Sequence, residues 1–428
     1  MPSLTTDPES KAVRPQWQAI TPKRSLQVNS LQGILFVAMT VVIMAYSFLV
    51  GPAAIILLYL LWLPYAFSFG FKRLIQSLKD NRLPIIYALL CLSTILWSNY
   101  RTVTARAAIE AVSMIICSLT IAQAVSLRSF ITGLNIGVVL VLVCTLISGR
   151  YGVDYFSGSA SLVGLFGSKN QVGLFAEIGI LSSAVYCITS KNIWGKLAVI
   201  LFPLGISLVC LYLSKSATSL ASLLLVLTCC TALYVLTRLS KNVRVVAIIF
   251  TLILALGTLA AGIGFNLQKE GFSLLGKDST LTGRTYLWAE GLQRGLETPI
   301  LGRGFAAFWV PGEPKAEEYW LKFGIETRTG FHFHNTYIEC FVELGIVGVL
   351  ILAFLFLTNL WRSLRYVFRY GMDMTGFFVF AMISMFFIRS FVEVDVFATF
   401  SIGAMIFFTL TPHLNRQILI NENPETKK

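Results

Sequence analysis

The sequence predicts an all-α polytopic membrane protein with about twelve transmembrane helices. Of its 428 residues, 56% are hydrophobic and 13% are charged, and the mean hydropathy is +0.75. Apolar runs of roughly 20 residues, long enough to cross a bilayer as a helix, recur along nearly the whole chain. They lack the alternating pattern of about ten residues that marks a membrane barrel strand. The predicted spans are 31–50, 53–70, 83–98, 107–125, 130–148, 171–189, 195–213, 217–237, 245–265, 337–360, 374–392 and 394–411.

These spans divide the chain into five parts. The first thirty residues are polar, basic and interrupted by three prolines, and no short apolar core follows a basic start as in a secretory signal. We therefore expect an uncleaved tail. The parts are a cytoplasmic N-terminal tail (1–30), spans one to nine (31–265), a long polar loop (266–336), spans ten to twelve (337–411) and a cytoplasmic C-terminal tail (412–428).

The distribution of lysine and arginine predicts the orientation. With the N-terminus inside, twenty of the 34 basic residues fall in the tails and short loops of the cytoplasmic side, six fall in the short external segments and the rest in the long loop. Basic residues in short loops stay on the cytoplasmic side. Both termini are thus expected inside and the long loop outside. This bias explains most of the formal charge of +13, and no basic, aromatic stripe of a nucleic-acid-binding module is present.

We expect neither a metal nor another cofactor. All eight cysteines fall within apolar runs without the spacing of metal ligands, which favours buried small hydrophobic residues. His332 and His334 would need a carboxylate from Glu317, Glu318 or Glu326, and these have no diagnostic spacing.

The long loop holds most of the polar chemistry. A helix is expected from Thr280 or Thr282 to about Glu297, with a stripe of Trp288, Leu292 and Leu296 resting on the membrane surface. That position would hold Arg284 near lipid headgroups.

Further along the loop, Gly302-Arg303-Gly304 permits close backbone approach, and an arginine there can bind phosphate oxygens in two-pronged fashion. A solvated basic loop is the alternative for Arg284 and Arg303.

Span ten opens with His334-Asn335-Thr336. Thr336 and Glu339 have the spacing of a capping box, and a helix start carries amide donors that suit anions. Gly345 and Gly348 lie near the His334 side of this helix and would let a neighbouring helix approach. The alternative is a histidine that is only an interfacial polar residue.

Further polar residues collect at the external ends of other spans, where they commonly line a substrate path. Two such turns have simpler interpretations. The aromatic residues Trp97 and Tyr100, beside Arg101, are typical of an interfacial belt. Arg389 and Glu393 lie four residues apart and could form only a structural ion pair. A plain loop is the alternative for Lys169-Asn170 and for Lys215-Ser216.

The motifs in combination resemble those of the O-antigen ligase and polysaccharide polymerase superfamily. His334-Asn335, nine residues and then Gly345-Ile346-Val347-Gly348 match its signature. Gly283-Arg284-Thr285…Trp288 followed by Pro299…Gly302-Arg303-Gly304-Phe305…Phe308-Trp309 look like its exopolysaccharide-polymerase branch. Trp97-Ser98 and Gly167…Asn170 also resemble that branch, and the resemblance covers about residues 85–400.

The resemblance implies a bundle of the metal-independent C-type glycosyltransferase kind, in the bacterial inner membrane, with its active site at the periplasmic surface. The implied donor is a glycan on undecaprenyl diphosphate, and the acceptor is a lipid-linked repeat unit or lipid A-core. A chain-length regulator is a candidate partner.

Carried over by position, Arg284 is the implied diphosphate-binding arginine and His334 the base or acceptor-orienting group. These two are the candidate catalytic residues. One departure is that Ser216 is followed by Ala217 where relatives often carry arginine or lysine; Lys215, on the other side of Ser216, is the candidate substitute. The candidate substrate-binding residues are Arg303, Asn335, Lys215, Lys169, Asn170, Arg101, Arg389, Glu393 and Trp288.

We therefore expect a polymerase of lipid-linked repeat units. A ligase that transfers glycan to lipid A-core, or a related enzyme that transfers it to protein, shares this chemistry and differs in acceptor. A lipid-linked oligosaccharide transporter is the alternative from another class, but we find no internal repeat, and the polar residues cluster on one face rather than at mid-depth.

Overall fold

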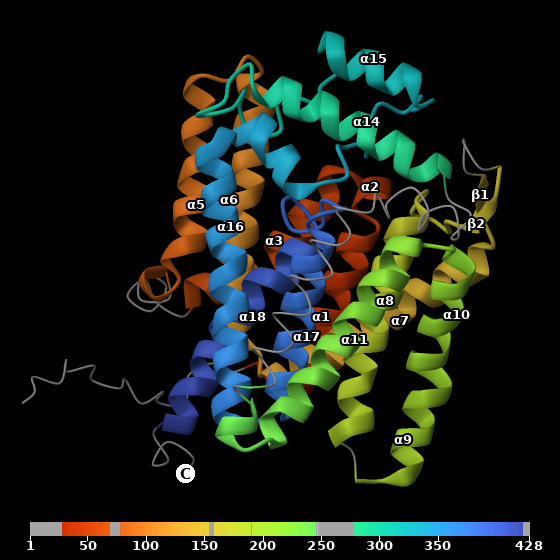
Figure 1. Cartoon of the computed structure of the whole chain (residues 1–428), viewed down its shortest axis with the longest axis vertical. Helices are drawn as coiled ribbons and strands as arrows, with labels where there is room; N and C mark the ends of the chain where they lie inside the picture. The colour runs from red at the N-terminus through yellow and green to blue at the C-terminus, as the bar shows by residue number, and fades with distance from the viewer. Residues whose placement is uncertain are drawn as a thin grey trace, which may run out of the picture.

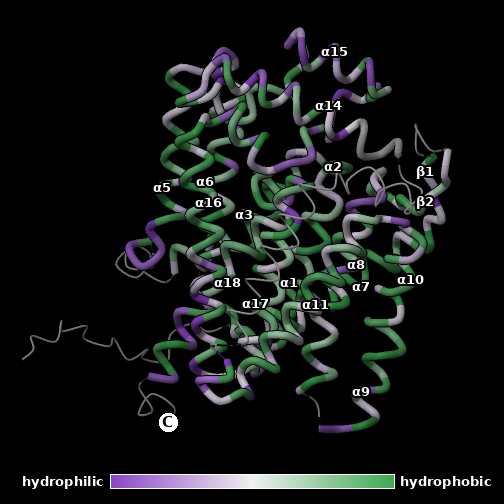
Figure 2. Tube along the Cα trace, in the orientation of Figure 1, coloured by the Kyte–Doolittle hydropathy of each residue, from purple (hydrophilic) through white to green (hydrophobic). Residues whose placement is uncertain are grey.

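The computed structural model describes residues 28–68, 78–153, 158–189, 191–244, 246 and 278–422, without the side chains of 278–282. Helices dominate this part of the chain, and hydrophobic residues cover most of their length while hydrophilic residues gather at the ends (Figures 1 and 2). Most of the predicted spans coincide with helices. Apart from residue 246, the ninth span, 245–265, and residues 266–277 of the long loop lie outside the described residues.

The first half of the bundle has these elements: α1 (Ser30–Ala45), α2 (Ser47–Val50), α3 (Pro52–Ser68), α5 (Arg82–Ser93) with the 3-10 turn η1 (Thr94–Leu96), α6 (Arg101–Ala124) and α7 (Leu127–Ser148). A short antiparallel hairpin, β1 (Tyr151–Val153) with β2 (Ala160–Leu162), follows and pairs Tyr151 with Leu162. This hairpin is a small departure from the all-α prediction.

The remaining elements are α8 (Lys169–Thr189), α9 (Ile193–Val199), the π-helical turn η2 (Ile200–Leu204), α10 (Gly205–Ser214), α11 (Ala217–Arg238), α14 (Asp278–Gly295), α15 (Pro314–Lys322), α16 (Thr336–Tyr370), α17 (Met374–Arg389) and α18 (Ile402–Glu422). Among the described residues, six helical segments are long and apolar enough to cross a membrane: 101–124, 127–148, 169–189, 193–214, 217–238 and 336–370. In the same part of the chain, four shorter apolar helices cover 30–45, 52–68, 82–96 and 374–389.

The last helix differs most from the prediction. Residues 390–401, which include the start of the predicted span 394–411, form turns, and α18 runs on through residues 412–422 of the predicted tail. An apolar run cannot reveal this shift, because hydropathy does not distinguish an apolar turn buried in protein from the first turns of a helix.

Small residues set two close contacts of the bundle. On α7, a Cβ added at Gly133 would come within 2.5 Å of the Ile34 oxygen of α1, and one at Gly137 within 2.8 Å of the Ala38 oxygen. Glycines four residues apart thus let α1 and α7 pack backbone against backbone.

The glycine pair of α16 has a different role from the one predicted. Gly345 breaks the helix with φ +64°, and a Cβ there would come within 2.3 Å of the Ile300 carbonyl. Backbone bonds from Ile346 N to Pro299 O (2.8 Å) and from Arg303 N to Val342 O (3.0 Å) join the loop to this kink. The close neighbour is therefore the loop, not another helix.

Helices α14 and α15 lie across one end of the bundle, opposite the end where α18 finishes (Figure 1). The loop that carries them has its own apolar cluster, which includes Leu287, Phe308, Tyr319, Trp320 and Phe333. Its contact with α16 through Ile338 and Val342 fixes the loop over the start of that helix.

Candidate active site

The carboxylate of Glu393 is the point where the candidate residues meet. Its Oε1 accepts a bond from Arg284 Nη2 at 2.7 Å and from Asn170 Nδ2 at 2.8 Å, and its Oε2 lies 3.4 Å from His334 Nδ1. Arg284 also donates from Nη1 to the Val392 carbonyl oxygen at 3.0 Å. Four residues predicted from separate segments are thus brought together.

The beginning of α16 holds His334 in place. Asn335 caps the helix, because its Oδ1 accepts from Tyr337 N at 2.9 Å and Ile338 N at 3.1 Å. His334, just before the cap, has φ +52°, a conformation that non-glycine residues adopt with strain. The N-cap is therefore Asn335. Thr336 is the first residue of the helix, so it does not occupy the cap position that the predicted capping box with Glu339 requires.

Thr336 and Asn335 instead tie the helix start to the turn that carries Glu393. Thr336 Oγ1 donates to the Glu393 carbonyl oxygen at 2.6 Å, and Asn335 Nδ2 donates to the Phe391 carbonyl oxygen at 2.9 Å. Glu339 accepts from Phe333 N at 2.8 Å. These bonds fix the distance between the imidazole and the carboxylate.

Two short turns complete the other side of the site. Asn170, in the first turn of α8, accepts from Ser216 Oγ at 3.1 Å through its Oδ1. Ser216 is the cap of α11 and bonds Ser219 N at 3.3 Å. Thr218 lies 3.4 Å from Arg284 Nη1. The helix starts of α8 and α11 therefore converge on the Arg284–Glu393 pair.

The charges favour an ionised carboxylate. Burial alone would raise the pKa of Glu393, but the hydrogen bond and charge of His334 and the charge of Arg284 outweigh it and hold this pKa well below its usual range. Burial, together with the nearby His334 and Arg284, lowers the pKa of His332 to about 3, so this imidazole is neutral near pH 7. Its Nδ1 accepts the His334 backbone N–H at 3.1 Å.

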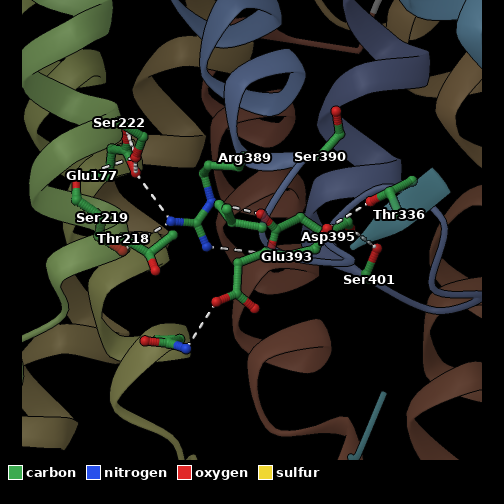
Figure 3. A network of polar contacts seen from close by, with 12 residues as sticks. Glu177, Thr218, Ser219, Ser222, Thr336, Arg389, Ser390, Glu393, Asp395 and Ser401 are labelled. Carbon is green, nitrogen blue, oxygen red and sulfur yellow. Dashed lines mark hydrogen bonds and ion pairs between the residues drawn. The ribbon is translucent and has the colours of Figure 1, made fainter. Parts of the chain in front are cut away.

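Arg389 is buried beside Glu393, between Glu177 and Asp395 (Figure 3). Its side chain is 1% exposed and bonds Asp395 at 2.6 Å through Nε, and Ser219 Oγ at 2.9 Å and Glu177 at 3.3 Å through Nη1. The alternative prediction, an ion pair between Arg389 and Glu393, is also not observed, because Glu393 pairs with Arg284 instead. In this structure no face of Arg389 is open to a substrate, since its donors point at protein oxygens.

Arg303 belongs to a second network. Its guanidinium bonds Glu297 and Glu313, the latter at 3.1 Å, and lies 5.8 Å from the ring centre of Phe308. Tyr100 donates to the same Glu313 at 3.2 Å, and Arg101 is exposed at the start of α6 beside it. Within the described part of the chain, Arg303 and Arg101 therefore share no hydrogen-bond or ion-pair partner with the Glu393 network.

The other three candidates differ in exposure. Lys215 is exposed at the end of α10 with φ +49°, and Lys169 is partly buried in the first turn of α8. Trp288 packs against the apolar cluster of the loop, while Leu292 and Leu296 are 48% and 68% exposed. Trp288 thus departs from the predicted surface stripe, because its ring faces the loop core.

Among the residues that the structure describes, one group of side chains has the spacing of a cation site. Ligand atoms of His332, His334 and Glu393 lie within 4.8 Å of one another. The carboxylate is Glu393 rather than Glu317, Glu318 or Glu326. The fit to a divalent cation is poor, because the Arg284 guanidinium bonds the same carboxylate and would repel the ion.

Sequence reasoning passed over Glu177, Thr218 and the Val392 carbonyl. A signal existed for Glu177, because a carboxylate in the middle of the apolar run 171–189 is costly unless it is paired. Its two oxygens both accept from Ser222 Oγ at 2.8 Å, and the side chain is fully buried. Nothing local marks Thr218 or Val392, whose roles arise from tertiary contact alone.

With this arrangement described, comparison with known proteins defines the class. Residues 202–353, from η2 to the middle of α16, match the O-Antigen ligase domain family. The chain belongs to the O-antigen ligase and polysaccharide polymerase family of membrane proteins, as its motifs predicted.

A particular relative extends the match over most of the chain. The protein is 32% identical over 391 residues to "Exopolysaccharide production protein ExoQ" of Rhizobium meliloti (strain 1021), which covers 89% of this chain and 88% of the relative. The family match includes Arg284, Arg303, His334 and the glycines of α16, and the longer match extends well beyond this region.

Proposed function

We propose that this protein is a metal-independent glycosyltransferase that polymerises undecaprenyl-diphosphate-linked repeat units at the periplasmic face of the inner membrane. The similarity to an exopolysaccharide production protein supports polymerisation. The observation that carries the proposal is the meeting of Arg284 and His334 on the buried carboxylate of Glu393, next to the loop.

In this proposal His334 is the general base. With Nδ1 directed at Glu393, the tautomer that donates from Nδ1 leaves the Nε2 lone pair for the acceptor hydroxyl. The hydroxyl oxygen attacks the anomeric carbon as its proton passes to Nε2, and the bond from that carbon to the diphosphate oxygen breaks. Glu393 stays ionised and stabilises the imidazolium that forms.

Arg284 then stabilises the departing diphosphate. A guanidinium has five N–H donors, and the bonds to Thr218, Val392 and Glu393 occupy three of them. The remaining donors are oriented by these bonds and are available to phosphate oxygens. Because Arg284 is 18% exposed and His334 24%, both can be reached from the loop side.

A ligase that transfers the same donor to lipid A-core is the second candidate, because the matched domain family is described as O-Antigen ligase. The two functions differ only in the acceptor. Each would use the same base and the same arginine.

The test is reconstitution of the purified protein with a lipid-linked repeat unit as the sole glycan. We expect a ladder of longer lipid-linked products without lipid A-core or added protein, in the presence of a chelator. No product until lipid A-core is supplied would support the ligase and overturn polymerisation. Dependence on a divalent cation would overturn metal independence.

A further inference from the structure

A cavity of about 420 Å³ lies far from the Glu393 site, at the beginning of α5. It is lined by residues 79–81 and by α5, α16 and α18, and its polar walls include Lys79, Arg82 and Arg362. Helix α5 with η1 runs from Arg82 to Leu96 and ends at the turn where Tyr100 bonds the loop residue Glu313. At about 1.5 Å per residue, the cavity is roughly 20 Å from that turn.

The cavity is rich in positive charge. Three basic side chains line it against one acidic side chain, Asp80. Arg362 is half-buried on α16, and within the described part of the chain it makes no hydrogen bond or ion pair. A partly desolvated guanidinium that forms no ion pair is costly, so an anionic group bound beside it in the cavity would stabilise it.

An apolar wall continues from the cavity onto the outside of the bundle. Leu83, Pro84 and Leu355 line the cavity, as does Ile86, which is 46% exposed. Leu89, one turn further along α5, is 59% exposed. Positive charge at one end and an exposed apolar helix face at the other match a phosphate headgroup joined to an acyl chain.

We propose that this cavity binds the headgroup of an anionic phospholipid, with the phosphate between Arg362, Arg82 and Lys79 and the acyl chain along the Ile86–Leu89 face of α5. The size of the cavity suits one glycerophosphate headgroup. Under the predicted orientation the lipid belongs to the cytoplasmic leaflet, so the site is separate from the glycan chemistry. It is independent of the proposed function.

The experiment measures lipid retention by the full-length protein by native mass spectrometry, with phosphatidylglycerol, phosphatidylcholine or inorganic phosphate as probes. We expect one phosphatidylglycerol to be retained per chain in preference to phosphatidylcholine. The variant Arg82→Gln/Arg362→Gln should bind it about tenfold more weakly, since charge-assisted bonds to phosphate are lost. The matched control is Arg128→Gln, an exposed arginine that does not line the cavity.

A second variant, Lys79→Gln/Arg82→Gln, changes only exposed side chains and keeps the test valid if the loss of Arg362 prevents folding. It should also weaken retention, by a smaller factor. Equal retention of phosphatidylglycerol by all variants, or equal retention of both lipids by the wild type, would refute the proposal. Binding of inorganic phosphate at the same residues without lipid would refute a lipid source.

Discussion

At the scale of single residues, one carboxylate determines the geometry of the candidate site. Glu393 lies in a turn, is 4% exposed, and contacts an arginine, a histidine and an asparagine from three other segments. Without it, Arg284 and His334 would be two positive or potentially positive groups side by side. The carboxylate lets both be held close while the site still presents donors to an anion.

Replacement of this carboxylate tests its role. Glu393→Gln keeps the size of the side chain but removes the charge that orients His334, so we expect the transfer rate to fall by about a hundredfold or more. The control is Glu422→Gln, which removes an exposed carboxylate paired with Arg369 at the far end of the bundle. A Glu393→Gln variant that retains most of its activity would show that His334 works without the carboxylate.

His332 gives a prediction about pH. Its pKa in the folded protein is about 3, below the ordinary value of about 6.5, so the unfolded chain binds more protons between these values. The stability it contributes is therefore present above about pH 6.5 and is lost as the pH falls towards 3. When the pH is lowered from 7 to 4.5, we expect the melting temperature of His332→Asn to fall by less than that of the wild type. A parallel loss in both proteins would contradict this assignment.

At the scale of elements, the turn 390–401 is the part that the sequence predicted least well. Its apolar residues predicted the start of a span, but the segment forms a folded turn. Arg389 bonds the Asp395 side chain, and Ser401 Oγ donates to the Asp395 carbonyl oxygen at 2.6 Å. Apolar helices and the loop motifs could be predicted because period and residue type are local. Register, caps and buried ion pairs could not, because they depend on which segments meet.

Arg389 is a positioning residue for this turn. Arg389→Met leaves Glu177 and Asp395 without their cation, and breaking a buried pair costs about 3–5 kcal/mol. We expect a lower melting temperature and a reduced kcat with a nearly unchanged KM, because the turn that carries Glu393 is displaced while the substrate surface remains.

The compensating variant Arg389→Met/Glu177→Gln should recover part of the lost stability. If Arg389 contacted the substrate instead, KM would rise and the second substitution would restore nothing.

At the scale of the whole molecule, the chemistry lies at one end of a largely apolar bundle. Helix α14, which carries Arg284, lies with α15 across one end of the bundle, and α18 finishes at the opposite end (Figure 1). His334 lies directly before the cap of α16, the helix whose start contacts the aromatic loop cluster. Hydropathy predicted that the polar loop lies at one end of an apolar bundle, whereas the orientation inferred from lysine and arginine stays a prediction. The combination of Arg284 with His334 followed from family motifs, whereas the central role of Glu393 needed the fold.

Reporter fusions test the orientation. A periplasm-dependent phosphatase inserted after Lys315 on α15 should be active, and the same enzyme fused after Lys428 should be inactive, because the loop is expected outside and the C-terminus inside. A cytoplasm-dependent fluorescent reporter should give the reverse result. Equal activity of the phosphatase at both positions would contradict the predicted topology.

The most direct test of the site compares donor consumption by the reconstituted wild type, His334→Ala and Arg284→Ala, each verified for membrane insertion and melting temperature. The loss of a general base costs about 10²–10⁴ in rate, and the loss of a cation that stabilises the leaving group costs a comparable amount. We predict that both variants insert, keep most of their stability and lose product formation by at least about a hundredfold. Persistence of polymer in both variants would contradict the assignment of Arg284 and His334 to the reaction.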